Sequence, residues 1–565
     1  MLKTIRYLGI TLAISGLLLL IFALNYNYEE FIHLAIKLTN TPESKKLKIT
    51  SLLTEIIFKT IQFIPILISF FGITIYYLSK SLTLYFHKTY NWTISIRKYL
   101  VDMQKKHKYA AIAIIGISLI FNTYNALTIP IFYDEAWTYL NFTRIGILSS
   151  ASWYPAPNNH ILHSILTNIT YNFPFSQTVN LRLPSIITTL IASICFFYLS
   201  TKFLSKNTSL ILLTLFCFSY PVIHYGYQAR GYSLLMLSFI ICFYSVLKIC
   251  YSKNSNSKFK KYRLLLSCGA IMGFYTMPSF LYPYFTCISF VFIHMILEKK
   301  YKNILSFTLV CFSTSIIIIT LYTPIFLVSG IESVISNRFV EPISRIEVLK
   351  RMIPHFSETT HFLFSSHLFT ISTLLVSIVL IIRKEIKVML TIYCFLIVPF
   401  ILIIHSVIPF PRSWIYLIVP FLFLIGLLIE NFKTLRFGST ILICSGIVVL
   451  LIFHTQQKNM LSTPFSFKAN RVAEFLINKN AKNVYINHGL LETNLRYIFE
   501  EKNQNIAVTY SNNKTDTNEI EKIKSSFDFV IIENKSISES DFNYIKSFDS
   551  DIHLSSLKKP TPNTK

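Results

Sequence analysis

The sequence predicts a polytopic membrane protein with an all-α membrane part and a small C-terminal α/β domain. Its 565 residues are 53% hydrophobic, and the mean hydropathy is +0.51. Only 14% of them are charged, whereas soluble domains carry about 25%. Uncharged apolar runs of about 18 or more residues recur along the chain, and each can cross roughly 30 Å of hydrocarbon. These observations exclude a water-soluble enzyme and a secreted protein with one cleaved leader.

The apolar runs predict about thirteen membrane spans in two groups. Two spans lie in an N-terminal extension over residues 1–107, and the others form a core over residues 108–454. The predicted spans are 7–24, 60–80, 109–129, 179–200, 208–226, 232–250, 264–281, 282–297, 304–328, 362–382, 388–407, 413–430 and 438–454.

The distribution of charge predicts the orientation. Residues 1–454 hold 38 basic and 14 acidic side chains, and residues 455–565 hold 15 and 13. A cytoplasmic N-terminus assigns 24 Lys and Arg residues to the cytoplasmic connections and about 12 to the opposite side, which agrees with the positive-inside rule. We therefore expect a multi-pass protein of the cell (inner) membrane, with loops 130–178 and 328–361 facing outward. No nucleic-acid partner is expected, because topology explains the basic excess.

Residues 455–565 are predicted to form an extracytoplasmic α/β domain. Helix-like stretches are Arg471–Asn478, Leu490–Glu501, Glu519–Ser525 and Ser540–Phe548. The β-rich stretches between them are Asn483–Ile486, Ile506–Tyr510, Phe527–Glu533 and Ile552–Leu557. Strands that alternate with helices favour βαβ units.

All nine cysteines lie inside predicted spans or at their ends, and no two have the close spacing of a metal site. Such cysteines are typical of small buried hydrophobic side chains. Neither a disulfide framework nor a structural zinc site is indicated.

Asp134 and Glu135 are the only acidic residues between Asp102 and Glu298. They directly follow a predicted span, in the motif Tyr-Asp-Glu-Ala-Trp at 133–137. Carboxylates at the edge of a span are costly unless they are solvated, paired or functional. One interpretation is an interfacial helix cap with aromatic neighbours. The other is an outward general base that deprotonates an acceptor hydroxyl or amine.

The segment 154–166 places polar side chains at the start of the next predicted helix. Asn158 or Asn159 is expected to begin this helix, because Asn is a favourable N-cap residue. His160 and His163 would then share one face. Two histidines at this spacing can bind a metal ion, but without nearby Cys or further His the pattern favours polar contacts to a ligand or to neighbouring loops.

Three arginines stand at the outward ends of spans, against the charge trend of the chain. They are Arg182, Arg230 and Arg412. Snorkelling explains any one of them. Three arginines with few acids nearby indicate an anionic partner, and the guanidinium fork matches phosphate. A lipid phosphate presented at the membrane surface fits this pattern.

Taken in order, these motifs resemble the family 39 (GT-C type) glycosyltransferases. This group is related to the dolichyl-phosphate-mannose protein mannosyltransferases and the lipid A aminoarabinose transferase. The motifs are Tyr-Asp-Glu-Ala-Trp (133–137), Pro-Asn-Asn-His (157–160), Leu-Arg-Leu-Pro-Ser (181–185) and Gln-Ala-Arg-Gly-Tyr-Ser-Leu (228–234). The likeness covers roughly residues 108–430 and does not extend to the first two spans.

The resemblance implies a GT-C fold with catalytic loops outside and a polyprenyl-phosphate sugar as donor. It implies that Asp134 and Glu135 are catalytic, with Asp134 activating the acceptor, and that Arg230 binds the donor phosphate. We expect His160 and Arg412 to assist Arg230, because this chain has His160 where the aminoarabinose transferase has a phosphate-binding lysine segment. Further substrate contacts are expected from Tyr133, Trp137, Asn158, Asn159, His163, Arg182, Gln228 and Tyr232.

The expected reaction is a direct displacement with inversion at the anomeric carbon. No cofactor is required, and a divalent metal is left open. The sugar stays open too, as does the acceptor, which is an envelope glycan, a lipid or a protein. The alternatives are a lipid-linked saccharide flippase or transporter, an oligosaccharide polymerase or ligase, and a non-catalytic scaffold. Transporters commonly show inverted repeats, and no repeat is visible in this chain.

Overall fold

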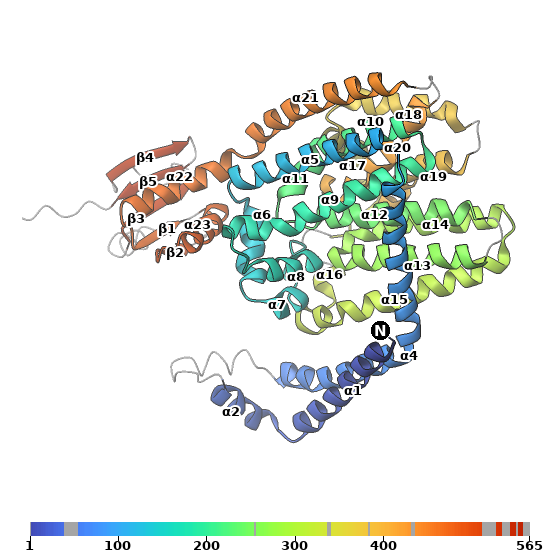
Figure 1. Ribbon diagram of the computed structural model, residues 1–565. Coiled ribbons are helices and arrows are strands. Elements are labelled where there is room, and N and C mark those ends of the chain that lie inside the picture. Colours follow the sequence, from blue (N-terminus) through green and yellow to red (C-terminus); the bar gives the residue numbers. More distant parts are fainter. Residues whose placement is uncertain are drawn as a thin grey trace, which may run out of the picture.

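The computed structural model (Figure 1) describes residues 2–38, 55–252, 256–335, 341–381, 385–430, 435–486, 488–510, 527–533, 543–549 and 552–556. Helices form the membrane part, and a small sheet forms at the C-terminal end of the chain.

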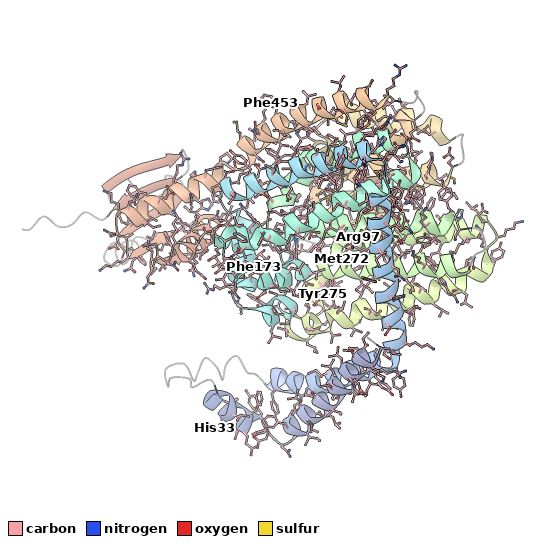
Figure 2. The ribbon with its side chains drawn as sticks, in the orientation of Figure 1. His33, Arg97, Phe173, Met272, Tyr275 and Phe453 are labelled. Carbon is pink, nitrogen blue, oxygen red and sulfur yellow. The ribbon has the colours of Figure 1, made fainter. Side chains whose placement is uncertain are left out.

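The N-terminal extension consists of α1 (Leu2–Leu24), α2 (Tyr28–Leu38) and α4 (Glu55–Val101). Gly9 of α1 lies against α4 so closely that an added Cβ would come within 2.7 Å of the Tyr76 backbone nitrogen; small residues permit such packing in membranes. The far end of α4 reaches the core, where Trp92 packs against Tyr198. Figures 1 and 2 show α1 and α2, with His33, standing apart from the main bundle.

The core helices follow the predicted spans closely. They are α5 (Lys105–Thr128), α9 (Gln177–Phe203), α10 (Lys206–Phe218), α11 (Tyr220–Tyr227), α12 (Tyr232–Cys250), α13 (Asn256–Thr276), α14 (Leu281–Leu297), α15 (Tyr301–Ser329), α18 (His367–Ile381), α19 (Ile386–His405), α20 (Ile418–Ile429) and α21 (Phe437–Ser462). The helix α12 is buried along almost its whole length and lies at the centre of the bundle. Side chains fill the space between the ribbons (Figure 2).

Within the described residues, nine helices are long and apolar enough to cross a membrane, and the bent pair α10 and α11 makes a tenth. The chain is therefore a multi-pass membrane protein, with fewer qualifying spans than the thirteen predicted. Every 18-residue stretch of α13 contains at least three basic residues, and α18 has only 15 residues. The predicted span 60–80 falls in α4, where several side chains lie outside the described part.

Short helices fill the two long loops that were predicted to face outward. The first loop contains α6 (Tyr133–Thr138), the π-helical turn η1 (Tyr139–Thr143), α7 (Ile147–Ser152) and α8 (Ile161–Thr170). The second contains α16 (Glu332–Ile335) and α17 (Arg345–Phe364). Two 3₁₀ turns, η2 (Pro278–Phe280) and η3 (Pro411–Leu417), lead into α14 and α20.

The C-terminal domain begins with α22 (Pro464–Asn478), after α21 has continued to Ser462. Its strands are β1 (Asn483–Ile486), β2 (Ala507–Tyr510), β3 (Phe529–Glu533), β4 (Asn543–Asp549) and β5 (Ile552–Ser556), in the order β2-β1-β3-β5-β4. The helix α23 (Gly489–Glu501) connects the parallel pair β1 and β2. This confirms the predicted βαβ unit.

One element of this domain was predicted wrongly. The stretch 540–548 was expected to be helical, but residues 543–549 form β4, antiparallel to β5. Only two residues separate the strands, so the two segments form a hairpin, and aromatic side chains such as Tyr544 and Phe548 suit a strand. The predicted helix 519–525 lies outside the described residues.

Candidate active site

A cavity of about 550 Å³ opens where these two long loops meet the ends of the core helices. It is lined from α6, the segments 154–160, 277–282 and 405–413, and the helices α15 and α16. Most of its lining is apolar and aromatic. Its polar side chains include Asp134, His160, His405 and Arg412.

Next to the cavity, Glu135 and Arg182 form a fully buried ion pair. Arg182 Nε and Nη2 lie 3.0 and 2.7 Å from the two carboxylate oxygens of Glu135. The backbone N–H groups of Phe132 and Ala229 donate to the same carboxylate, at 2.9 and 2.6 Å. Four hydrogen bonds use the acceptor capacity of Glu135, since a carboxylate has about four lone-pair sites.

Arg182 is used just as completely. Beyond Glu135, its guanidinium donates to the carbonyl oxygens of Ala126, Ile129 and Pro130. These three carbonyls lie in the last turn of α5 and directly after it, where a helix has no further N–H groups to bond its carbonyl oxygens. All five N–H donors of Arg182 are therefore satisfied within the protein. The placement of Glu135 and Arg182 speaks against the catalytic and substrate-binding roles expected for them, because the pair joins α5, α6 and α9 and has no free capacity.

Asp134, one residue earlier, has a different environment. Its side chain is 32% exposed and lines the cavity. Its Oδ2 atom lies 3.1 Å from Arg412 Nη1 and 3.8 Å from Arg230 Nη2. Asp134 and Glu135 stand in the first turn of α6, where a negative charge is favourable near the helix N-terminus. This agrees with the helix-cap interpretation, and the general-base interpretation of Asp134 stays a prediction.

Arg230 and Arg412 approach Asp134 from two sides. Arg230, in the segment between α11 and α12, is only 2% exposed and donates to the carbonyl oxygens of Asp134 and Asn158 and to Thr138 Oγ1. It is not among the residues that line the cavity. Arg412, on η3, is 33% exposed and lines it. A ligand in the cavity therefore meets Arg412 directly, whereas Arg230 lies behind Asp134.

His160, at the start of α8, presents an N–H donor beside these groups. The Gly231 N–H donates to its Nδ1 atom at 2.7 Å, so the ring proton of neutral His160 lies on Nε2, 3.3 Å from Arg230 Nη2. Burial, and then the charge of Arg230, hold the pKa of His160 well below its usual value. Gly231 permits this contact, because an added Cβ would lie 2.9 Å from the Cβ atom of His160. Two donors that face each other create a place for an anion.

The structure divides the remaining predicted residues into two sets. Tyr133, Trp137, Asn158 and Tyr232 line the cavity. The other set bonds within the protein and does not line it, and comprises Asn159 (to Ser150 and Trp153), His163 (to Ser185) and Gln228 (to His224). The helix α8 begins at Ile161 rather than at 158 or 159, since the side chain of Asn159 donates to the two preceding carbonyls instead of capping the helix.

Among the described residues, no group of three or more His, Cys, Asp or Glu side chains is arranged to hold a metal ion. Asp134 is the carboxylate in the cavity lining, and Arg412 already binds it. A metal ion would have to displace this arginine, and the Nδ1 atom of His160 is occupied by the Gly231 N–H.

No family model and no curated protein matches the sequence. The crystal structure of ArnT from Cupriavidus metallidurans bound to undecaprenyl phosphate matches the fold with a TM-score of 0.53 at 9% identity. The match covers 79% of this chain and 97% of that chain. The apo state of the same protein gives a TM-score of 0.49 at 10% identity. The chain has a GT-C-like fold.

Within this GT-C-like fold, the sequence missed several residues of the cavity. They are Tyr154, Phe274, Tyr282, Tyr322 and His405. His405 ends the helix α19 and accepts or donates a hydrogen bond at 3.2 Å with the Tyr282 hydroxyl. Its position at the predicted outward end of a span, seven residues before Arg412, is the same signal that singled out the arginines. The tyrosines give no such signal, because aromatic residues are common throughout the chain.

Proposed function

We propose that the protein is a membrane glycosyltransferase that moves a sugar from a polyprenyl-phosphate donor to an acceptor outside the cell membrane. One observation carries the proposal. A carboxylate, Asp134, and a guanidinium, Arg412, both partly exposed, line one cavity 3.1 Å apart, with His160 and its Nε2–H donor in the same lining. A base and an anion site side by side are what transfer from a phosphate requires. The GT-C-like fold supports this, because ArnT is bound to undecaprenyl phosphate in its structure.

In the proposed reaction, Arg412 and His160 hold the donor phosphate at the polar part of the cavity. The apolar side chains of α15 and α16, including Ile318, Phe326 and Ile335, also line it and suit a prenyl chain. Arg230 supports Asp134 and His160 from behind. This modifies the assignment implied by the resemblance, in which Arg230 binds the phosphate.

Asp134 then acts as the general base. It accepts the proton of the acceptor hydroxyl or amine, while the acceptor atom forms a bond to the anomeric carbon. The bond between that carbon and the phosphate oxygen breaks, and the lipid phosphate leaves with the electron pair, so the configuration inverts. Phosphate bound to Arg412 competes with Asp134 for this guanidinium. Donor binding therefore frees this carboxylate to take the proton of the acceptor.

The sugar and the acceptor are to be identified in cells before transfer rates are measured. Mass spectrometry of envelope glycans from a deletion strain and its parent is expected to show one missing sugar, which names both sugar and acceptor. Accumulation of a lipid-linked precursor on the inner face would instead support a flippase. The proposal also places the protein in the inner membrane, with the N-terminus in the cytoplasm and the C-terminal domain outside.

Asp134→Asn is the decisive variant. Loss of the general base is expected to lower transfer by about 10²- to 10⁴-fold, while binding of undecaprenyl phosphate to the purified protein stays unchanged. Arg412→Gln is expected to weaken that binding. The control is Asp102→Asn, an exposed acid outside the cavity. Wild-type transfer by the Asp134→Asn protein would overturn the assignment.

A further inference from the structure

The C-terminal domain shares its hydrophobic core with the residues that surround the cavity. Five residues of the membrane part belong to the same buried cluster as the interior of α22, α23 and β1. They are Ile131, Ala136, Tyr139, Leu181 and Ala229. Each of them is within five residues of Asp134, Arg182 or Arg230 in the sequence. The C-terminal domain therefore packs directly against the segments that carry Asp134, Arg182 and Arg230.

Polar contacts from α23 fix the turn that follows α6. Glu500 accepts hydrogen bonds from the Tyr139 hydroxyl at 2.6 Å and from Arg144 Nη1 at 2.7 Å. The ring of Tyr497 packs edge-on against the ring of Tyr139, with centroids 5.1 Å apart. Burial, and then the bond to Glu500, raise the pKa of the Tyr139 phenol. This hydroxyl therefore stays a donor.

A second set of contacts holds the start of α9. Glu501 accepts from the backbone N–H and the hydroxyl of Thr178, at 3.1 and 2.6 Å. The Tyr497 hydroxyl lies 2.9 Å from the same hydroxyl of Thr178. One face of α23 thus connects the loop after α6 with the helix that carries Arg182.

The path from Glu500 to Asp134 is short. Tyr139 directly follows Thr138, whose hydroxyl donates to the Asp134 carbonyl at 2.7 Å and accepts from Arg230 at 3.1 Å. Tyr139 opens the π-helical turn η1, and such turns are frequent at functional sites because they change the direction of side chains. Here Trp137 lines the cavity, while Tyr139 contacts α23.

We propose that α23 positions the general base, with Glu500 acting through Tyr139 as a positioning residue. The C-terminal domain thereby sets the geometry of Asp134 relative to the donor, whereas Arg412 and His160 are held by other segments of the core. This inference rests on the proposed function for its kinetic readout only. A displacement of about 1 Å at a reacting group can cost about 100-fold in rate. Loss of the hydrogen bond between Glu500 and Tyr139 is therefore expected to lower the rate measurably.

The test compares Glu500→Ala with Glu474→Ala. Glu474 is an exposed acid of α22 in the same domain, and it accepts a hydrogen bond from Asn470 and forms an ion pair with Lys502. The Glu500→Ala protein is expected to lose about 10- to 100-fold in kcat, with undecaprenyl phosphate binding within twofold of wild type. Glu500→Gln is expected to recover part of this loss, because its amide oxygen still accepts from Tyr139. The Glu474→Ala protein is expected to behave as wild type.

Two variants and a second readout keep the inference open to refutation. Tyr139→Phe removes one hydroxyl and leaves the packing, so it reproduces the kcat loss without general unfolding. Hydrogen exchange of the amides of residues 133–143 is expected to rise in Glu500→Ala, and this holds even if the proposed reaction is wrong. Unchanged kcat and unchanged exchange would overturn the positioning role. An equal fall in kcat, donor binding and melting temperature would show general destabilisation and would overturn it too.

Discussion

The adjacent acids Asp134 and Glu135 belong to two ion pairs that differ in burial and in hydrogen bonding. Glu135 and Arg182 are both fully buried, and every polar atom of their charged groups is used. Asp134 and Arg412 are each about one-third exposed and meet at the wall of a cavity. The first pair connects helices, and the second is available to a ligand. The comparison shows that burial and free hydrogen-bonding capacity, rather than charge alone, distinguish a carboxylate that a ligand can reach from one that only connects helices.

The largest effect on stability is expected at the buried pair. Glu135→Gln removes one charge and leaves Arg182 buried without its partner, which costs about 3–5 kcal/mol. The prediction is a lower yield of folded protein and a lower melting temperature in detergent. Asp134→Asn, measured beside it, is expected to melt close to wild type. Equal melting of the two variants would erase the distinction between the pairs.

A smaller effect is expected from buried histidine, and it depends on pH. Burial, and then the charge of Arg230, lower the pKa of His163 to about 3, whereas histidine in unfolded chains titrates near 6.5. Between these values the unfolded state binds a proton that the folded state does not. Stability is therefore complete above about pH 6.5 and falls by about 1.4 kcal/mol per pH unit below it.

The measurement is the melting temperature between pH 7 and pH 5. His163→Gln is expected to flatten its dependence on pH, even if the variant is less stable at pH 7. His87→Gln, at an exposed position of α4, is expected to keep the wild-type slope. A wild-type slope in His163→Gln would show that other groups dominate.

The smallest effect is expected at an exposed ion pair. Glu347 and Arg351 form an i,i+4 pair on α17, with side chains 34% and 61% exposed. Such pairs contribute about 0.3–0.5 kcal/mol, and salt screens them. Glu347→Gln should therefore lower the melting temperature only slightly, and this change should be smaller still at high salt. A loss as large as that of Glu135→Gln would mean that burial does not rank these pairs.

The sequence predicted the membrane architecture and the main residues of the cavity for identifiable reasons. Apolar runs mark helices because hydrocarbon accepts only backbones that are satisfied internally. Asp134, His160 and Arg412 were recognised because ionisable groups at outward span ends are rare. The structure places all three in one cavity, although Arg412 is 278 residues from Asp134 in the chain.

The rest depended on tertiary contacts that no local pattern encodes. Glu135 looks like Asp134 in the sequence, and only the Ala229 N–H and Arg182 reveal its different role. Asn159 and Gln228 were expected near the substrate. The Asn159 amide instead donates to the Ser150 carbonyl, and the Gln228 amide forms a hydrogen bond with His224. In β4, pairing with β5 overrides a helical preference, since strand propensity depends on the partner.

The shared core of Tyr139 with α22 and α23 has a consequence for how the protein is made. Translation delivers the loop after α5 hundreds of residues before α22 and α23, and chains fold from the N-terminus as they emerge. The buried contacts of Tyr139 with these two helices can therefore form only after the last fifth of the chain has been made. A chain that stops before α22 lacks these contacts and leaves this part of the hydrophobic core incomplete.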